Sequence, residues 1–152
     1  MDLFPQNKEE RLLELLAHEK EMFEQMRGLI GEQAKLLAAD DIAGFNRSLD
    51  KGQETIDMIN GLHQESDDLM QSYTSYSNSE KGKKIDAIED AAALIRELLT
   101  ECAGLHQKNS AAAKEKSEEY AGQSSQLRTR RESLGLYAQP PPEAPMMFDR
   151  KT

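Results

Sequence analysis

The sequence predicts an all-α protein, namely an antiparallel three-helix bundle with an extended third helix and a flexible C-terminal tail. The composition is 38% hydrophobic and 31% charged, with no Trp, which suits long helices that share a narrow apolar seam. Apolar residues recur at spacings of three, four and seven in three stretches, and short polar segments separate those stretches. The 152 residues fit one domain, with a bundle over residues 1–134 and a Pro-rich tail over 135–152.

The first helix is expected over residues 8–38. Asn7 is a candidate N-cap, and Glu10 stands where a capping box places its partner. Its large apolar residues form two adjacent rows along the helix. Together these rows make an apolar face broader than the seam of a two-helix coiled coil, so we expect this helix to contact two other helices. The rows consist of Leu15, Met22, Leu29 and Leu36, and of Leu16, Phe23, Ile30 and Leu37.

The second helix is expected over residues 41–73, after a cap supplied by Asp40 and Asp41. Gly52 falls within its seam, where a small residue lets a neighbouring helix approach closely. The short connection favours an antiparallel pair, and Ser72–Gly82 is expected to form the second turn. The seam residues are Ile42, Phe45, Leu49, Ile56, Ile59, His63 and Met70.

The third helix is expected over residues 83–134. Its seam from Ile85 to Leu134 would span about 75 Å, against about 45 to 50 Å for each of the first two helices. We expect it to pack on both neighbours as far as His106 and to overhang beyond, because later seam positions are too polar to bury. Across the three helices, the expected core residues are Leu16, Phe23, Ile30, Ile56, Ile95 and Leu99.

The tail begins where Gly135 suits a helix stop. Pro140, Pro141 and Pro142 favour an extended polyproline conformation. An apolar cluster, Met146 to Phe148, lies near the C-terminus and belongs to no seam. This cluster is either part of a tail without a binding role or a short docking motif.

Charge and hydropathy narrow the function classes. The net charge of −9 argues against nucleic-acid binding, which needs clustered Lys and Arg. Residues 1–107 carry 11 basic and 22 acidic side chains, whereas residues 108–134 carry 6 and 4, so the two stretches are expected to do different jobs. No run approaches the roughly 18 to 20 apolar residues of a membrane span, and the N-terminus lacks the pattern of a signal peptide. We expect a cytoplasmic protein without membrane insertion.

Residues for catalysis are scarce. The chain has no phosphate-binding Gly-rich loop, HExxH or CxxC motif. We expect His18 on the surface and His63 and His106 in seams, with no metal site. Cys102, at a seam position, is expected to be a small buried hydrophobe. The sequence therefore predicts no enzyme, no catalytic residue and no cofactor, although a metal-dependent helical enzyme remains a third hypothesis.

Three segments resemble the FlgN family of flagellar type III export chaperones. They are the leucine-rich run from Leu12 to Phe23, the segment from Leu36 to Phe45 with its acidic turn, and Lys51 followed by Ile56 and Leu62. The ending Leu134-Gly-Leu-Tyr137 is also similar to the family's close. The resemblance covers roughly residues 10–137, and the chain differs from the family in its polar stretch over 108–126 and in its tail.

The resemblance implies a cytosolic chaperone that binds the hook–filament junction proteins FlgK and FlgL through its C-terminal helical region and keeps them unassembled. We expect Tyr120, Leu127 and Leu134, spaced by seven, to bind the client. Leu136 and Tyr137 are expected to dock the loaded chaperone at the export gate. The alternative is a structural coiled-coil protein that self-assembles through the same stripe.

Overall fold

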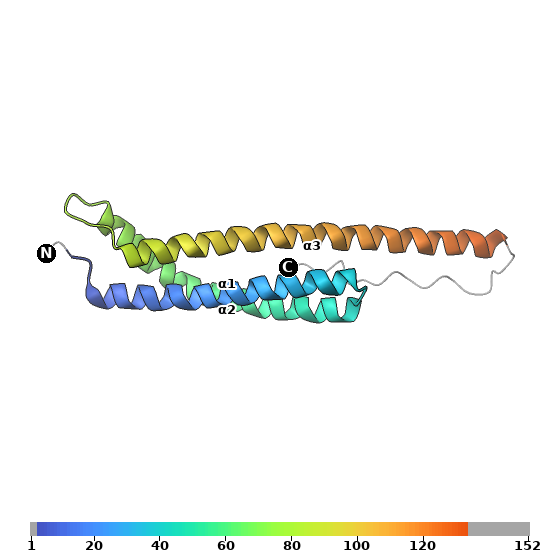
Figure 1. Cartoon of the computed structure of the whole chain (residues 1–152), viewed down its shortest axis with the longest axis horizontal. Coiled ribbons are helices and arrows are strands. Elements are labelled where there is room, and N and C mark those ends of the chain that lie inside the picture. Colours follow the sequence, from blue (N-terminus) through green and yellow to red (C-terminus); the bar gives the residue numbers. More distant parts are fainter. Residues whose placement is uncertain (1–2, 134–152) are drawn as a thin grey trace.

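The computed structural model describes the chain from Leu3 to Ser133, with side chains as far as Thr129. It contains three helices, α1 (Gln6–Ala38), α2 (Ile42–Ser77) and α3 (Asp86–Ser133), joined by two short links (Figure 1). The predicted all-α fold class, a three-helix bundle, is confirmed. Within the described part of the chain, no helix is both long and apolar enough to cross a membrane.

The helix ends differ in places from the prediction. α1 begins at Gln6 after Pro5, and no side chain caps it, so the capping box at Asn7 was wrong. Asp41 does cap α2, because its carboxylate accepts a hydrogen bond from the Gly44 amide at 2.9 Å. α2 continues to Ser77, past the predicted end at residue 73, because Tyr73 lies within the apolar core and extends its buried face.

α1 is the central helix of the bundle. α2 runs antiparallel to α1, whereas α3 runs parallel to it, and both pack on α1. α2 and α3 hardly touch each other along most of their length. Near their link α2 and α3 share an apolar cluster through Tyr73 and Ile88, but the expectation that α3 packs on both neighbours as far as His106 was wrong.

Two apolar clusters hold the ends of the bundle together. Phe4 lies edge-on against the ring of Tyr73, with 5.6 Å between the ring centroids, near the link between α2 and α3. At the other end, the last turn of α1 meets the first turn of α2 and the middle of α3. The first cluster contains Phe4, Leu12, Leu16, Tyr73 and Ile88, and the second contains Leu37, Phe45 and Ala113.

Polar and small residues fill the middle of the bundle. Gln33 of α1 donates a hydrogen bond to the carbonyl of Ser48 at 3.3 Å. Gly52 lets α2 approach closely, since a Cβ there would lie 3.3 Å from Met26 Cε. The buried face of α2 in this region consists of Ser48, Gly52 and Thr55, so Ile56 is only partly buried. Phe45 and Ile59 of the predicted row are buried, but between them small residues bring α2 against α1.

The seam of α3 also differs from the prediction. Leu98 faces α1 and is buried, whereas Leu99 is 52% exposed, so its assignment to the core was wrong. The physical reason is that α2 does not cover this side of α3. Leu16 and Ile30 are buried as predicted, and the other predicted core residues, Phe23, Ile56 and Ile95, are partly buried.

Packing of α3 on α1 continues further than the sequence indicated. Asn109 is buried and donates a hydrogen bond to the carbonyl of Ile30 at 2.8 Å. Lys116 pairs with Asp40, in the turn after α1. Asn109 was judged too polar to bury, but the backbone acceptor satisfies its amide. The overhang of α3 therefore begins near residue 117, about ten residues later than expected.

Candidate protein-binding surfaces

Residues 117–133 of α3 extend past the α1–α2 turn (Figure 1). None of the side chains from Ser117 to Thr129 is buried. Two large apolar side chains stand in this segment, Tyr120 at 40% exposed and Leu127 at 46% exposed. Because they are seven residues apart, they lie on one face of the helix. We call these two residues the overhang stripe.

Only part of the predicted binding set falls on the described residues. Tyr120 and Leu127 lie on the overhang, as expected. Leu134, Leu136 and Tyr137 lie outside the described residues, so the structure places neither the continuation of the stripe nor the expected gate-docking residues. Arg128, next to Leu127 in the sequence, is exposed.

A second surface was not anticipated from the sequence. An apolar groove of about 390 Å³ runs between α2 and α3, with α1 as its floor. Met26 and Ile30 line the floor, Ile56 lines the α2 wall, and Leu99 and His106 line the α3 wall. The exposure of Leu99 would have revealed this groove, but the sequence pattern assigns Leu99 to a seam.

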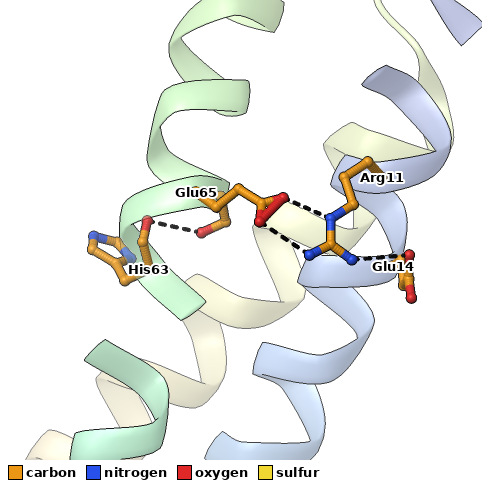
Figure 2. Close-up of polar contacts among 5 residues, drawn as sticks. Arg11, Glu14, His63 and Glu65 are labelled. Atoms are coloured by element: carbon orange, nitrogen blue, oxygen red, sulfur yellow. Dashed lines mark hydrogen bonds and ion pairs between the residues drawn. The ribbon is translucent and has the colours of Figure 1, made fainter. Parts of the chain in front are cut away.

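An exposed ion pair links α1 to α2. Arg11 of α1 binds Glu65 of α2 through two hydrogen bonds, at 2.6 and 3.0 Å, and also contacts Glu14 (Figure 2). The hydrogen bond from Arg11 lowers the pKa of Glu65, and the same bond raises the pKa of Arg11. Both side chains are solvent-exposed, so this pair orients α2 on α1 and adds little stability.

The candidate nucleophile and metal ligands are dispersed. Cys102 is buried, burial raises the pKa of its thiol, and the thiol contacts the carbonyl of Phe23 at 3.6 Å. These features disfavour a thiolate nucleophile. His18 and His63 are exposed and His106 lines the groove, so the placement of His63 in a seam was wrong. Among residues 3–133, no three His, Cys, Asp or Glu side chains gather as a metal site requires.

The chain was compared with family models, curated proteins and solved structures, and no match was found in any of the three.

Proposed function

We propose that this protein is a cytoplasmic export chaperone that holds another protein, in the manner implied by its resemblance to FlgN. The observation that carries the proposal is the overhang, in which a helix continues beyond its bundle while exposing Tyr120 and Leu127 on one face. A free apolar stripe on a helix is the form of surface that an amphipathic client helix covers. FlgK and FlgL are the proposed clients.

The charge of the overhang supports a protein client. Residues 117–133 carry three basic and three acidic side chains in a chain with a net charge of −9, so the surface around the stripe repels an acidic segment less than the rest of the molecule does. Arg128 lies next to Leu127 and would act mainly on the association rate.

The test is calorimetric titration with purified junction-protein fragments. The double variant Tyr120→Ala, Leu127→Ala should keep its melting temperature, because neither side chain is buried, and should lose about 1 kcal/mol or more of binding free energy. Its matched control is Glu118→Ala, Ser125→Ala, which changes two exposed positions of the same segment at the same spacing. The control should bind as the unchanged chain does.

The alternative is self-assembly through the same stripe, and it makes the opposite prediction. Sedimentation of the chain alone would then show a dimer that the Tyr120→Ala, Leu127→Ala variant abolishes. That result, together with unchanged affinity for junction-protein fragments, would replace the chaperone with a structural coiled-coil protein.

A further inference from the structure

The groove between α2 and α3 is an uncovered apolar site. Leu99 on its wall is 52% exposed, although α1 lies beneath it and α2 lies opposite. Large apolar side chains that face a groove of about 390 Å³ favour an occupant that removes them from water. Met26 on the floor has a flexible side chain that adapts to the shape of an occupant.

The lining of the groove defines the chemistry of that occupant. Among the residues that the structure describes, no Asp, Glu, Lys or Arg lines it, although 31% of the chain is charged. Its polar members, Gln33, Gln53 and His106, have side chains that donate and accept hydrogen bonds. The groove therefore suits a short, uncharged, apolar peptide, since burying a charge there without a partner would be costly.

The chain itself contains such a peptide beyond the described residues. Residues 134–148 include one charged side chain, Glu143, and they end in Met146, Met147 and Phe148. We propose that the Met146–Phe148 cluster docks in the groove of its own chain, so that the groove is the binding site for the C-terminal segment. This inference does not depend on the proposed export function.

The length of the segment matches the distance to the groove. From Ser133 back to His106, at the mouth nearest the overhang, α3 spans about 40 Å. The 13 residues from Leu134 to Met146 reach at most about 43 to 47 Å, and the 15 residues to Phe148 reach about 50 to 54 Å. The cluster therefore reaches the mouth with little slack. Prolines 140 to 142 and Pro145 favour the extended conformation that this reach requires.

Because the segment is barely long enough, shortening it distinguishes docking within one chain from docking between two copies. Deleting residues 138–143 leaves 9 residues from Leu134 to Phe148, both included, with a reach of at most about 32 Å. The cluster would then fall short of its own groove, yet it could still enter that of a second copy. Replacing Ala138, Gln139 and Glu143 by Ser, which keeps both the length and the prolines, is the matched control.

A tryptophan reporter tests the proposal in the full-length chain. The protein has no Trp, so Phe148→Trp introduces a single fluorophore into the docking cluster. We expect blue-shifted emission and several-fold slower quenching by acrylamide than in the 138–143 deletion. Adding Ala103→Phe fills the groove from an exposed position on its α3 wall and should release the tryptophan to water. Ala111→Phe, at an exposed α3 position that does not line the groove, should not.

Each other outcome overturns the proposal. Emission typical of free tryptophan in the full-length chain means that the cluster does not dock. A blue shift that survives Ala103→Phe, in a variant whose circular dichroism is unchanged, means that the cluster docks elsewhere. A blue shift that survives the 138–143 deletion, or that grows with protein concentration, assigns the groove to the segment of a second copy.

Discussion

Ile30 of α1 packs beneath both neighbouring helices, α2 and α3. Its side chain is 2% exposed, and its carbonyl accepts the hydrogen bond from Asn109 of α3. Ile30→Ala should lower the free energy of unfolding by about 2 to 5 kcal/mol, because a cavity would open beneath both flanking helices. Urea denaturation measures the change. Leu99→Ala is the comparison, and it should cost about 1 kcal/mol or less because half of that side chain is already in water. Equal losses would contradict the assignment of Leu99 to an open groove.

Tyr73 joins the end of α2 to the start of α3. Its buried hydroxyl accepts a hydrogen bond from the Ile85 amide at 2.8 Å. Tyr73→Phe keeps the ring but leaves that amide without its partner, so it should lower stability by about 1 to 2 kcal/mol in thermal or urea unfolding.

The pH dependence of Tyr73 has a definite sign. Burial raises the pKa of its phenol in the folded state, so folding favours the neutral form. This contribution is complete below the unfolded pKa of about 10 and is lost as the pH rises towards the folded value. Unfolding measured from pH 8 to 11 should therefore show a steeper alkaline loss of stability for the unchanged chain than for Tyr73→Phe. Parallel curves would mean that Tyr73 ionises equally in both states.

At the scale of the helix, the sequence predicted α1 best. Its seven-residue rows include Leu15, Leu16, Ile30 and Leu37, all of which are buried, because α1 contacts helices on two sides and needs a broad apolar face. α2 was harder to predict, since between the buried Phe45 and Ile59 its contact face consists of small residues, which a search for large apolar side chains does not detect.

In α3, the sequence alone does not tell which of two adjacent leucines is buried. Leu98 and Leu99 fit a helical seam equally well by spacing, and only the position of α2 decides that Leu98 is buried while Leu99 lines the groove. The exposure of Tyr120 and Leu127 was foreseeable, because their stretch of the sequence has too few apolar residues to bury. The groove was not foreseeable, because it depends on α2 and α3 failing to pack against each other.

Local stability should vary along α3. Ile88 and Leu98 are buried against α1, whereas no side chain from Ser117 to Thr129 is buried. Amides from Ile88 to Leu98 should exchange with solvent much more slowly than those from Ser117 to Thr129 in the isolated protein. The change should fall near Lys116, where the pair with Asp40 ends the packing. Uniform protection along α3, measured by NMR, would show that the overhang is held by a contact absent from the bundle.

The part of the molecule that the structure describes divides into a body, residues 3–116, and an arm, the overhang of α3. The body has an apolar cluster at each end, and the groove lies between them on the side where α2 and α3 separate. The arm is the part of α3 that lies beyond the α1–α2 turn (Figure 1). A body that folds without the arm would leave the stripe available for a partner, so the independence of the two parts is a requirement of the proposed function.

A truncation series tests that independence. A chain that ends at Glu118 keeps Asn109, Ala113 and Lys116, the last contacts of α3 with the body. It should melt within about 2 °C of a chain that ends at Ser133, because the residues removed bury nothing.

The matched comparison is a chain that ends at Gln107. It lacks the hydrogen bond from Asn109 to Ile30 and the contribution of Ala113 to the cluster with Leu37 and Phe45. Its free energy of unfolding should fall by about 2 kcal/mol or more, which lowers the melting temperature by roughly 8 °C in a domain of this size. Calorimetry measures the melting temperature after each of the two truncations, from Ser133 to Glu118 and from Glu118 to Gln107. A large fall already on shortening from Ser133 to Glu118 would mean that the arm stabilises the body, and a stripe engaged in that way would not be free to bind a client.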